Sequence, residues 1–195
     1  AARVGEQELA DEFAISRGRV REAIRILERE GLVQVLPRRG AVVTSLSAQE
    51  LRELFEIRAG LVEIALRKVM GAGVPPELLA ITRAGVARLE ALAELPEGGD
   101  AYAETTYRLI QIGAHFAGNE RLRRMVVALS LQSLRYSKLG LASVARRQRS
   151  VKLWRQALQA LERGDVERTL WLARQRSQES ADEAARRLAE PSGGS

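Results

Sequence analysis

The arginines whose spacing indicates a binding surface are concentrated in one stretch, ISRGRVREAIRILEREG, which runs from Ile15 to Gly31. Its arginines stand at spacings that gather them in the first turn and along one side of a helix. They are Arg17, Arg19, Arg21, Arg25 and Arg29. A guanidinium fork pairs with the major-groove edge of guanine or with phosphate oxygens. The stretch therefore indicates a helix that contacts DNA, and the alternative from the charge pattern alone is a solvated basic face.

The same stretch has the features of a helix packed on a core. Ser16 stands where its hydroxyl can accept from the free backbone N–H groups of a first helical turn. Val20, Ala23, Ile24 and Leu27 fall on one side at helical spacing, so we expect that face to be buried. Such a helix needs neighbouring elements to cover its apolar face.

The flanking segments predict those neighbours. A short helix begins at about Glu6, and the break before Ser16 is so short that the two helices form a helix-turn-helix. After Gly31, the β-rich runs LVQVL and AVVT flank a Pro/Gly turn, which is typical of a hairpin. The tip of this hairpin carries two arginines, Arg38 and Arg39. We therefore predict a winged helix-turn-helix domain with a basic wing over residues 1–45.

Composition restricts the function classes. The 195 residues carry a formal net charge of +6, which weakly favours a polyanionic partner. There is no cysteine, which excludes disulfides, thiol catalysis and zinc-finger chemistry. No apolar run is as long as a membrane span and no signal peptide opens the sequence, so we expect a cytoplasmic protein without a membrane partner.

The segment ELADEFAISRGRVREAIRILEREGLVQVLPRRGAVVT resembles the DNA-binding domain of the GntR superfamily of bacterial transcription regulators. The resemblance implies that Arg17 and Arg21 contact bases, that Ser16 contacts a phosphate, and that Gly40 is the wing glycine. Gly18 and Arg19 replace a usual threonine–proline pair, which implies an unusual operator preference. The family's first helix is expected to be missing, because this sequence begins where the second helix should begin.

Residues 47–189 are expected to form an all-α bundle, and residues 190–195 a flexible tail. Ser47 and Glu50 have capping-box spacing at the start of the first helix. The breaks predict helices at about 47–71, 76–94, 100–117, 120–139, 143–163 and 165–189. The runs ELFEIRAGLVEIA, FAGNERL and ALQALERGDVERTL resemble the FCD ligand-binding domain of the FadR-type branch of the superfamily. The fold class is therefore mainly α, with the small β-hairpin wing as its β structure.

Arg58 lies on the apolar stripe of the first bundle helix, where an unpaired arginine is costly. One interpretation is a structural ion pair with an acid of another helix. The other follows from the resemblance, in which an arginine at this position often meets the carboxylate of a small effector, a task that suits bidentate guanidinium geometry.

Many members of that branch hold a divalent metal with one aspartate and three histidines. The corresponding positions here are Thr106, Ile110, Trp154 and Arg176, and none can supply such a set of ligands. We therefore expect no metal and no cofactor. An aspartate is replaced by a neutral residue and Arg176 adds a positive charge, so the resemblance predicts a pocket for an anion. The acid group of this anion would lie near Arg58 or Arg176, and its apolar body near Trp154 and Ile110.

No catalytic constellation is recognisable. The single histidine, His115, has no partner at metal-site spacing and is interpreted as a helix-end residue. We therefore do not expect an enzyme, although a helical enzyme with an appended winged domain is a rival interpretation.

The expected protein is a transcription regulator, with repression the usual sign in the family. It would bind a near-palindromic operator in double-stranded DNA as a homodimer. A small anionic or amphipathic effector, such as a carboxylate or an acyl-CoA, would change its DNA affinity. The alternative is a bundle that binds no small molecule and serves as a dimerisation or protein-interaction module.

Overall fold

The computed structural model describes residues 3–37 and 40–189. The chain divides into two compact units between Leu46 and Ser47, and each is described by itself. Arg38, Arg39 and residues 190–195, which were expected to form the wing tip and a flexible tail, lie outside the described residues.

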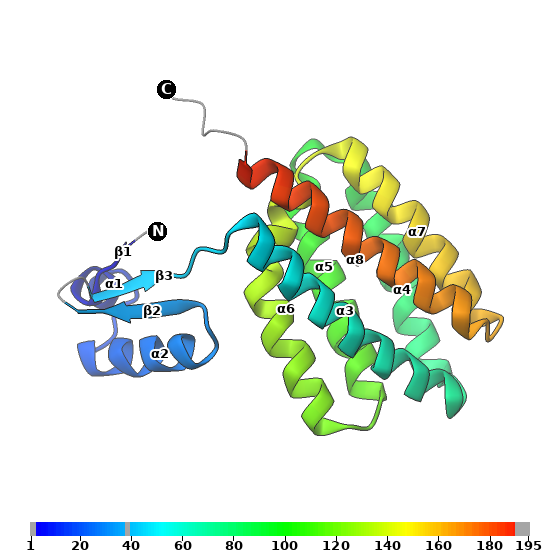
Figure 1. The fold of residues 1–195 in the computed structure, drawn as a ribbon, viewed down its shortest axis with the longest axis horizontal. Coiled ribbons are helices and arrows are strands. Elements are labelled where there is room, and N and C mark those ends of the chain that lie inside the picture. The colour runs from blue at the N-terminus through cyan, green and yellow to red at the C-terminus, as the bar shows by residue number, and fades with distance from the viewer. Residues whose placement is uncertain (1–2, 38–39, 190–195) are drawn as a thin grey trace. The chain divides into compact units, whose positions relative to one another are not determined.

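The first unit combines two helices with a three-stranded antiparallel sheet (Figure 1). Its elements are β1 (Arg3–Val4), α1 (Glu6–Glu12), α2 (Arg17–Arg29), β2 (Val33–Leu36) and β3 (Gly40–Val43). The helix-turn-helix and the hairpin of β2 and β3 were predicted. The strand β1 was not, and it pairs with β3 in the register Arg3↔Val42 and Val4↔Ala41. The sheet order is therefore β1-β3-β2.

Local signals explain where α2 begins and which face it buries. The Ser16 side chain accepts a hydrogen bond from the backbone N–H of Arg19 at 3.4 Å, which confirms the predicted cap. Val20 and Ile24 are buried against the core of the unit, and Leu27 is partly buried. Ala23 is exposed, contrary to the sequence prediction, because the buried stripe of α2 is narrower than its apolar residues suggest.

The second unit is a bundle of six α-helices with one turn of 3₁₀-helix, η1 (Pro96–Gly98) (Figure 1). The helices are α3 (Ala48–Gly71), α4 (Pro76–Glu94), α5 (Gly99–Phe116), α6 (Glu120–Gly140), α7 (Val144–Glu162) and α8 (Val166–Ala189). The predicted bounds hold to within about a residue at each end. The capping box at Ser47 and Glu50 is formed, with both reciprocal hydrogen bonds present.

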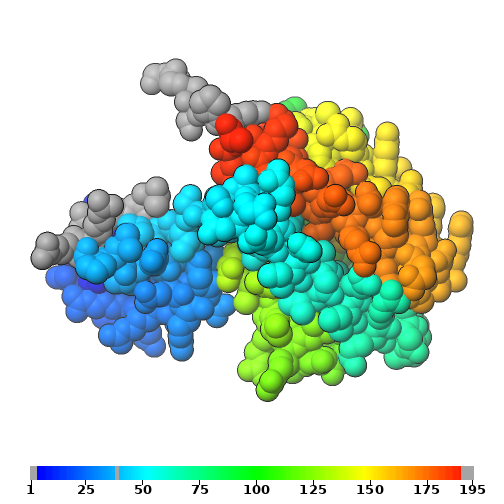
Figure 2. Space-filling model, viewed as in Figure 1, coloured from blue at the N-terminus to red at the C-terminus, as the bar shows by residue number. Residues whose placement is uncertain are grey.

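The helix α3 packs along α8, and these two form a continuous surface of the bundle (Figure 2). Figure 1 shows α6 beside α3, α7 beside α8, and α4 and α5 behind them, so α3 and α8 cover the interior in which the candidate site is found. None of the described helices is both long enough and apolar enough to cross a membrane.

A buried arginine joins two helix ends in this bundle. Arg147, in the first turn of α7, donates to the carbonyl oxygens of Leu141 and Ala142 after α6 and of Leu95 and Pro96 after α4. The last carbonyl groups of a helix have no partner within the helix. Arg147 therefore supplies the donors that these chain ends need in the interior.

Candidate functional site

The first candidate site is the exposed side of α2. The side chains of Arg17 and Arg21 are each 58% exposed, and both approach one carboxylate of α1. The Nε of Arg21 donates to Oε2 of Glu6 at 2.8 Å, and Nη2 of Arg17 lies 3.8 Å from the same oxygen. Glu6 thereby holds the two guanidinium groups that the sequence predicted as base contacts on one side of the helix.

The remaining predicted DNA-contacting residues are at the surface where the structure describes them. Arg19 and Gly18 are exposed in the first turn of α2. A Cβ at position 18 would meet only the Oγ of Ser16, at 3.9 Å, so the glycine is not required by packing. Gly40 is exposed and has φ +70, a conformation that favours glycine. This surface has a packed back and a basic front, which is the arrangement a recognition helix needs.

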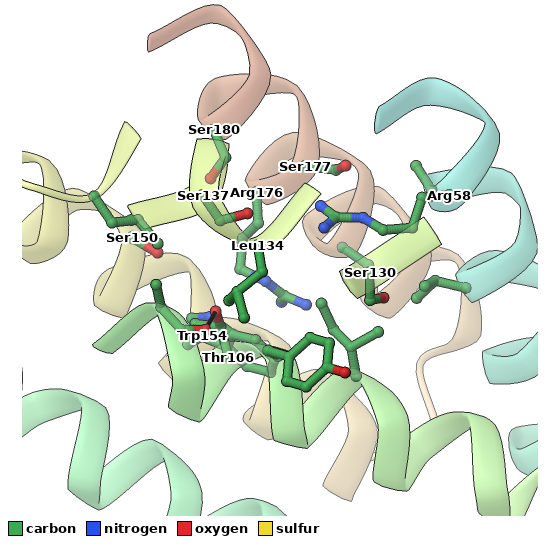
Figure 3. A pocket seen from close by; sticks show the side chains of 17 residues that line it. Arg58, Thr106, Ser130, Leu134, Ser137, Ser150, Trp154, Arg176, Ser177 and Ser180 are labelled. Atoms are coloured by element: carbon green, nitrogen blue, oxygen red, sulfur yellow. Dashed lines mark hydrogen bonds between the residues drawn. The ribbon is translucent and has the colours of Figure 1, made fainter. Parts of the chain in front are cut away.

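The second candidate site is a cavity of about 60 Å³ inside the bundle (Figure 3). All five residues predicted to contact an effector line it, although they come from four different helices: Arg58, Thr106, Ile110, Trp154 and Arg176. The structure thus brings the predicted residues together in one place. Their role as ligand contacts stays a prediction.

Arg58 is buried and has a hydroxyl, not a carboxylate, as its partner. Its Nη1 donates to Oγ of Ser133 at 2.6 Å, and its guanidinium carbon lies 4.3 Å from the ring centre of Phe55. No ion pair joins Arg58 to an acid of residues 3–37 or 40–189, so the interpretation as a structural ion pair does not hold within that part of the chain. Burial lowers the pKa of Arg58 to about 10, so it remains a cation at neutral pH.

Arg176 is a second cation facing the cavity. Its guanidinium carbon lies 3.7 Å from the ring centre of Trp154, and its Nη1 is buried without a hydrogen-bond partner. Burial, with a smaller effect of the charge of Arg58, lowers the pKa of Arg176 to about 10. Figure 3 shows both guanidinium groups turned toward the same interior space. Two like charges without an acid between them make this space strongly attractive to an anion.

Hydroxyl groups that the sequence analysis did not single out complete the lining. Five serines border the cavity: Ser130, Ser137, Ser150, Ser177 and Ser180. The Oγ of Ser130 is buried without a hydrogen-bond partner, so a donor or acceptor is available there. The spacing of Ser130, Ser133 and Ser137 on α6 could have indicated a polar face, because residues at i, i+3 and i+7 share one side of a helix.

The other predicted positions contribute shape more than charge. The Thr106 hydroxyl donates to the carbonyl of Ala103 at 2.7 Å, so its hydrogen is committed to its own helix. Trp154 is 8% exposed and lies in the core. Among the described residues, no three His, Cys, Asp or Glu side chains gather closely enough to hold a metal ion. His115 is exposed in the last turn of α5.

Comparison with known families divides the chain in the same way. Residues 2–43 match the family model described as bacterial regulatory proteins, gntR family. Residues 53–176 match the model of the FCD domain. The first match contains the described part of the basic surface, and the second contains all five predicted cavity residues.

Individual relatives are similar over shorter stretches. The uncharacterised HTH-type transcriptional regulator YdhC of Bacillus subtilis is 38% identical over 76 residues, covering 39% of this chain and 34% of YdhC. The gluconate operon transcriptional repressor of Bacillus licheniformis is 42% identical over 55 residues, covering 28% of this chain and 22% of the repressor. The matched stretch spans about a third or less of each of these two relatives. They are regulators rather than enzymes.

The solved structure of McbR/YncC from E. coli superimposes with a TM-score of 0.83 at 19% identity. That superposition covers 96% of this chain and 88% of the other. At this identity the comparison establishes the shared fold.

Proposed function

The chain belongs to the gntR family of bacterial regulatory proteins and carries an FCD domain, and from this premise we propose that it is an effector-controlled repressor of transcription. Residues 1–45 would be the winged helix-turn-helix that binds DNA, and residues 47–189 the domain that binds effector and dimerises. As a regulator of bacterial DNA it would act in the cytoplasm.

Operator recognition is assigned to the first half of α2. Arg17 and Arg21 would read base edges, while Ser16, Arg19 and the wing would contact the backbone. Gly18 leaves this surface without a side chain next to the two reading arginines. A single recognition helix reads one half-site, so a near-palindromic operator requires a homodimer. Repression is proposed because a repressor is among the relatives.

Effector control is assigned to the bundle cavity. The observation that carries this proposal is that two cationic groups, Arg58 and Arg176, face one small interior space with no acid of the described residues between them. An anion would relieve the repulsion between them and accept their hydrogen bonds. Its binding would shift the balance between two arrangements of the dimer that differ in DNA affinity. The small volume favours a compact carboxylate over an acyl-CoA.

The operator assignment is tested by titrating specific and random duplex DNA with three forms of the protein. Arg21→Ala is expected to weaken specific binding by about 1–3 kcal/mol if it forms a bidentate base contact. Arg29→Ala, on the same helix but in its last turn, is the matched control and should affect both duplexes little. Equal losses on both duplexes for Arg21→Ala would show that this residue touches only phosphate.

The effector assignment is tested by a thermal-shift screen with carboxylates, sugar acids and acyl-CoA thioesters. A ligand of the native state raises the melting temperature as its concentration exceeds Kd. Arg58→Met should abolish the response to a hit and leave operator binding intact. If no compound stabilises the protein, the bundle is a ligand-free dimerisation or interaction module. Sedimentation that finds only monomer at micromolar concentration would contradict the homodimer.

A further inference from the structure

A second cavity of about 70 Å³ adjoins the first. The two cavities share five lining residues, so they meet at one boundary: Val62, Ile110, Trp154, Ala173 and Arg176. Beyond that boundary, the second cavity is bordered by residues of α3, α4, α5, α7 and α8, among them Leu78, Leu109 and Leu158. We call the first the arginine chamber and the second the apolar chamber.

The two chambers differ in chemistry. The arginine chamber has two guanidinium groups and five serines. The apolar chamber has Thr82 and Thr169 as its only lining hydroxyls within the described residues, and each donates to the backbone carbonyl oxygen four residues earlier at 2.7 Å. With those hydrogens committed and leucine and alanine as the main neighbours, the apolar chamber offers contacts to hydrocarbon.

Arg176 and Trp154 stand at the boundary. The guanidinium lies over the indole ring and is turned toward the arginine chamber (Figure 3), and both residues also line the apolar chamber. A ligand that reaches both chambers must pass this pair. The buried Nη1 of Arg176 has no partner in the unliganded protein, which leaves a donor ready at the junction.

We propose that the site takes a short amphipathic monoanion, whose acid group lies between Arg58 and Arg176 and whose hydrocarbon chain passes Trp154 into the apolar chamber. This inference rests on the proposed effector function and adds the ligand class to it. The acid group accepts charge-assisted hydrogen bonds from two cations and offsets one of their two charges, which an uncharged head group cannot do. The chain removes apolar surface from water, which a sugar acid cannot do.

The volume of the apolar chamber limits the length of the chain. At about 70 Å³ it is half the size of a cavity of roughly 150 Å³ that accommodates a benzene ring. A few methylene groups therefore fill it. Until it is full, each methylene should tighten binding by about fourfold, the factor that corresponds to burying one such group.

The probes are linear alkanoates from acetate to decanoate, titrated into the full chain by calorimetry, with the matching alkanamides as neutral controls. Affinity should rise from acetate to hexanoate and stop rising beyond octanoate. The amides should bind at least about tenfold more weakly, because they lose charge-assisted hydrogen bonds. In a Trp171→Phe background, the fluorescence of Trp154 should change on binding, since Trp171 is 46% exposed and would otherwise contribute.

Two glycine variants test where the hydrocarbon chain of the ligand lies. Gly113 borders the apolar chamber, and a Cβ built there meets no atom within 4 Å, so Gly113→Leu has room to fill it. Gly60→Leu is the matched control, because Gly60 is also within a helix with open space around its Cβ but borders neither chamber. Gly113→Leu should bind acetate normally and lose the gain with chain length, while Gly60→Leu should behave as the unmodified protein.

The outcomes separate this inference from the proposed function. Alkanoates that bind equally at every length, or a Gly113→Leu variant that keeps the chain-length gain, would overturn the apolar chamber and leave the anion site standing. Amides that bind as tightly as acids would instead overturn the anion site. If no alkanoate binds while a sugar acid does, the ligand class proposed here is wrong and effector control is retained. If nothing binds, both are wrong.

Discussion

The same substitution should destabilise the protein at one buried arginine of the bundle and not at another. Arg58 is 7% exposed and Arg147 is 0% exposed, and both would be replaced by methionine, which has a similar length and no charge. A buried cation carries a desolvation penalty of several kcal/mol that its partners must repay. The direction of each change therefore depends on what the guanidinium group holds.

Arg147 donates to four carbonyl oxygens, of which that of Leu95 also accepts from the backbone N–H of Gly98 at 3.0 Å. The bonds to Leu141, Ala142 and Pro96 measure 2.9, 2.6 and 3.2 Å, and Leu95 is the fourth acceptor. Hydrogen bonds to a charged group contribute about 1.5–3 kcal/mol each, and a buried group left unsatisfied costs about 1–3 kcal/mol. Relief of desolvation offsets part of this loss. We expect Arg147→Met to destabilise the protein by about 3–5 kcal/mol.

Arg58 makes fewer hydrogen bonds than Arg147. It contacts one serine hydroxyl, that of Ser133, and the face of Phe55, and the Ser133 hydroxyl also donates to the carbonyl of Ser130 at 3.1 Å. Arg58→Met removes the desolvation penalty and the repulsion from Arg176, so the expected change lies between zero and a stabilisation of about 2 kcal/mol. Because Arg58 does not stabilise the folded protein, its presence in the interior is better explained by ligand binding than by stability.

Urea unfolding followed by far-UV circular dichroism, at one protein concentration without ligand, measures both changes as shifts of the midpoint. Arg147→Met should move the midpoint to lower urea, and Arg58→Met should leave it or raise it. If both variants lose stability equally, the distinction between a capping and a binding arginine is refuted. If Arg147→Met lowers the free energy of unfolding by less than about 1 kcal/mol, the four carbonyl contacts do not stabilise the two helix ends.

Three further predictions concern acid stability, the wing and metal. Arg186 and Arg187 donate to Glu183 and lower its pKa from 4.5 to about 2. The contribution of Glu183 to the free energy of unfolding is therefore present above pH 4.5 and lost as the pH falls toward 2. Glu183→Gln should lower the free energy of unfolding by about 1–2 kcal/mol at neutral pH and flatten the acid dependence of the unfolding midpoint. Gly40→Ala should destabilise the first unit by about 1 kcal/mol, measured by calorimetry, because φ +70 strains a residue with a Cβ. A chelator should leave the melting temperature unchanged, and elemental analysis should find no stoichiometric zinc, nickel or manganese.

Short-range signals in the sequence predicted the helices and the hairpin. Ser16 and the pair Ser47–Glu50 act on backbone groups within three residues, and the positive-φ glycines at Gly31 and Gly164 end the helices before them. The strand β1 was missed because two residues have no periodicity, and its partner β3 lies almost the whole length of the unit away.

The resemblance to the superfamily brought together pocket residues that no local sequence pattern connects. Arg58 and Arg176 are separated by more than a hundred residues, and only the superfamily resemblance placed them at one pocket. The same reasoning missed the serines of α6 and α8, because a hydroxyl on a helix has no recognisable role until the neighbouring helix is known. It also gave no reason to single out Arg147 among the many arginines of the chain.

The sequence by itself determined the helices, the hairpin, the ends of these elements and the basic side of α2, since each depends on groups that are neighbours along the chain. Tertiary structure alone decided what the buried charges face. Arg58 contacts a serine of α6 rather than an acid, Arg147 contacts the ends of two other helices, and Arg176 lines both cavities. The physical reason is that desolvation and hydrogen bonding act over a few ångströms in space, and helix packing brings those groups together from distant parts of the chain.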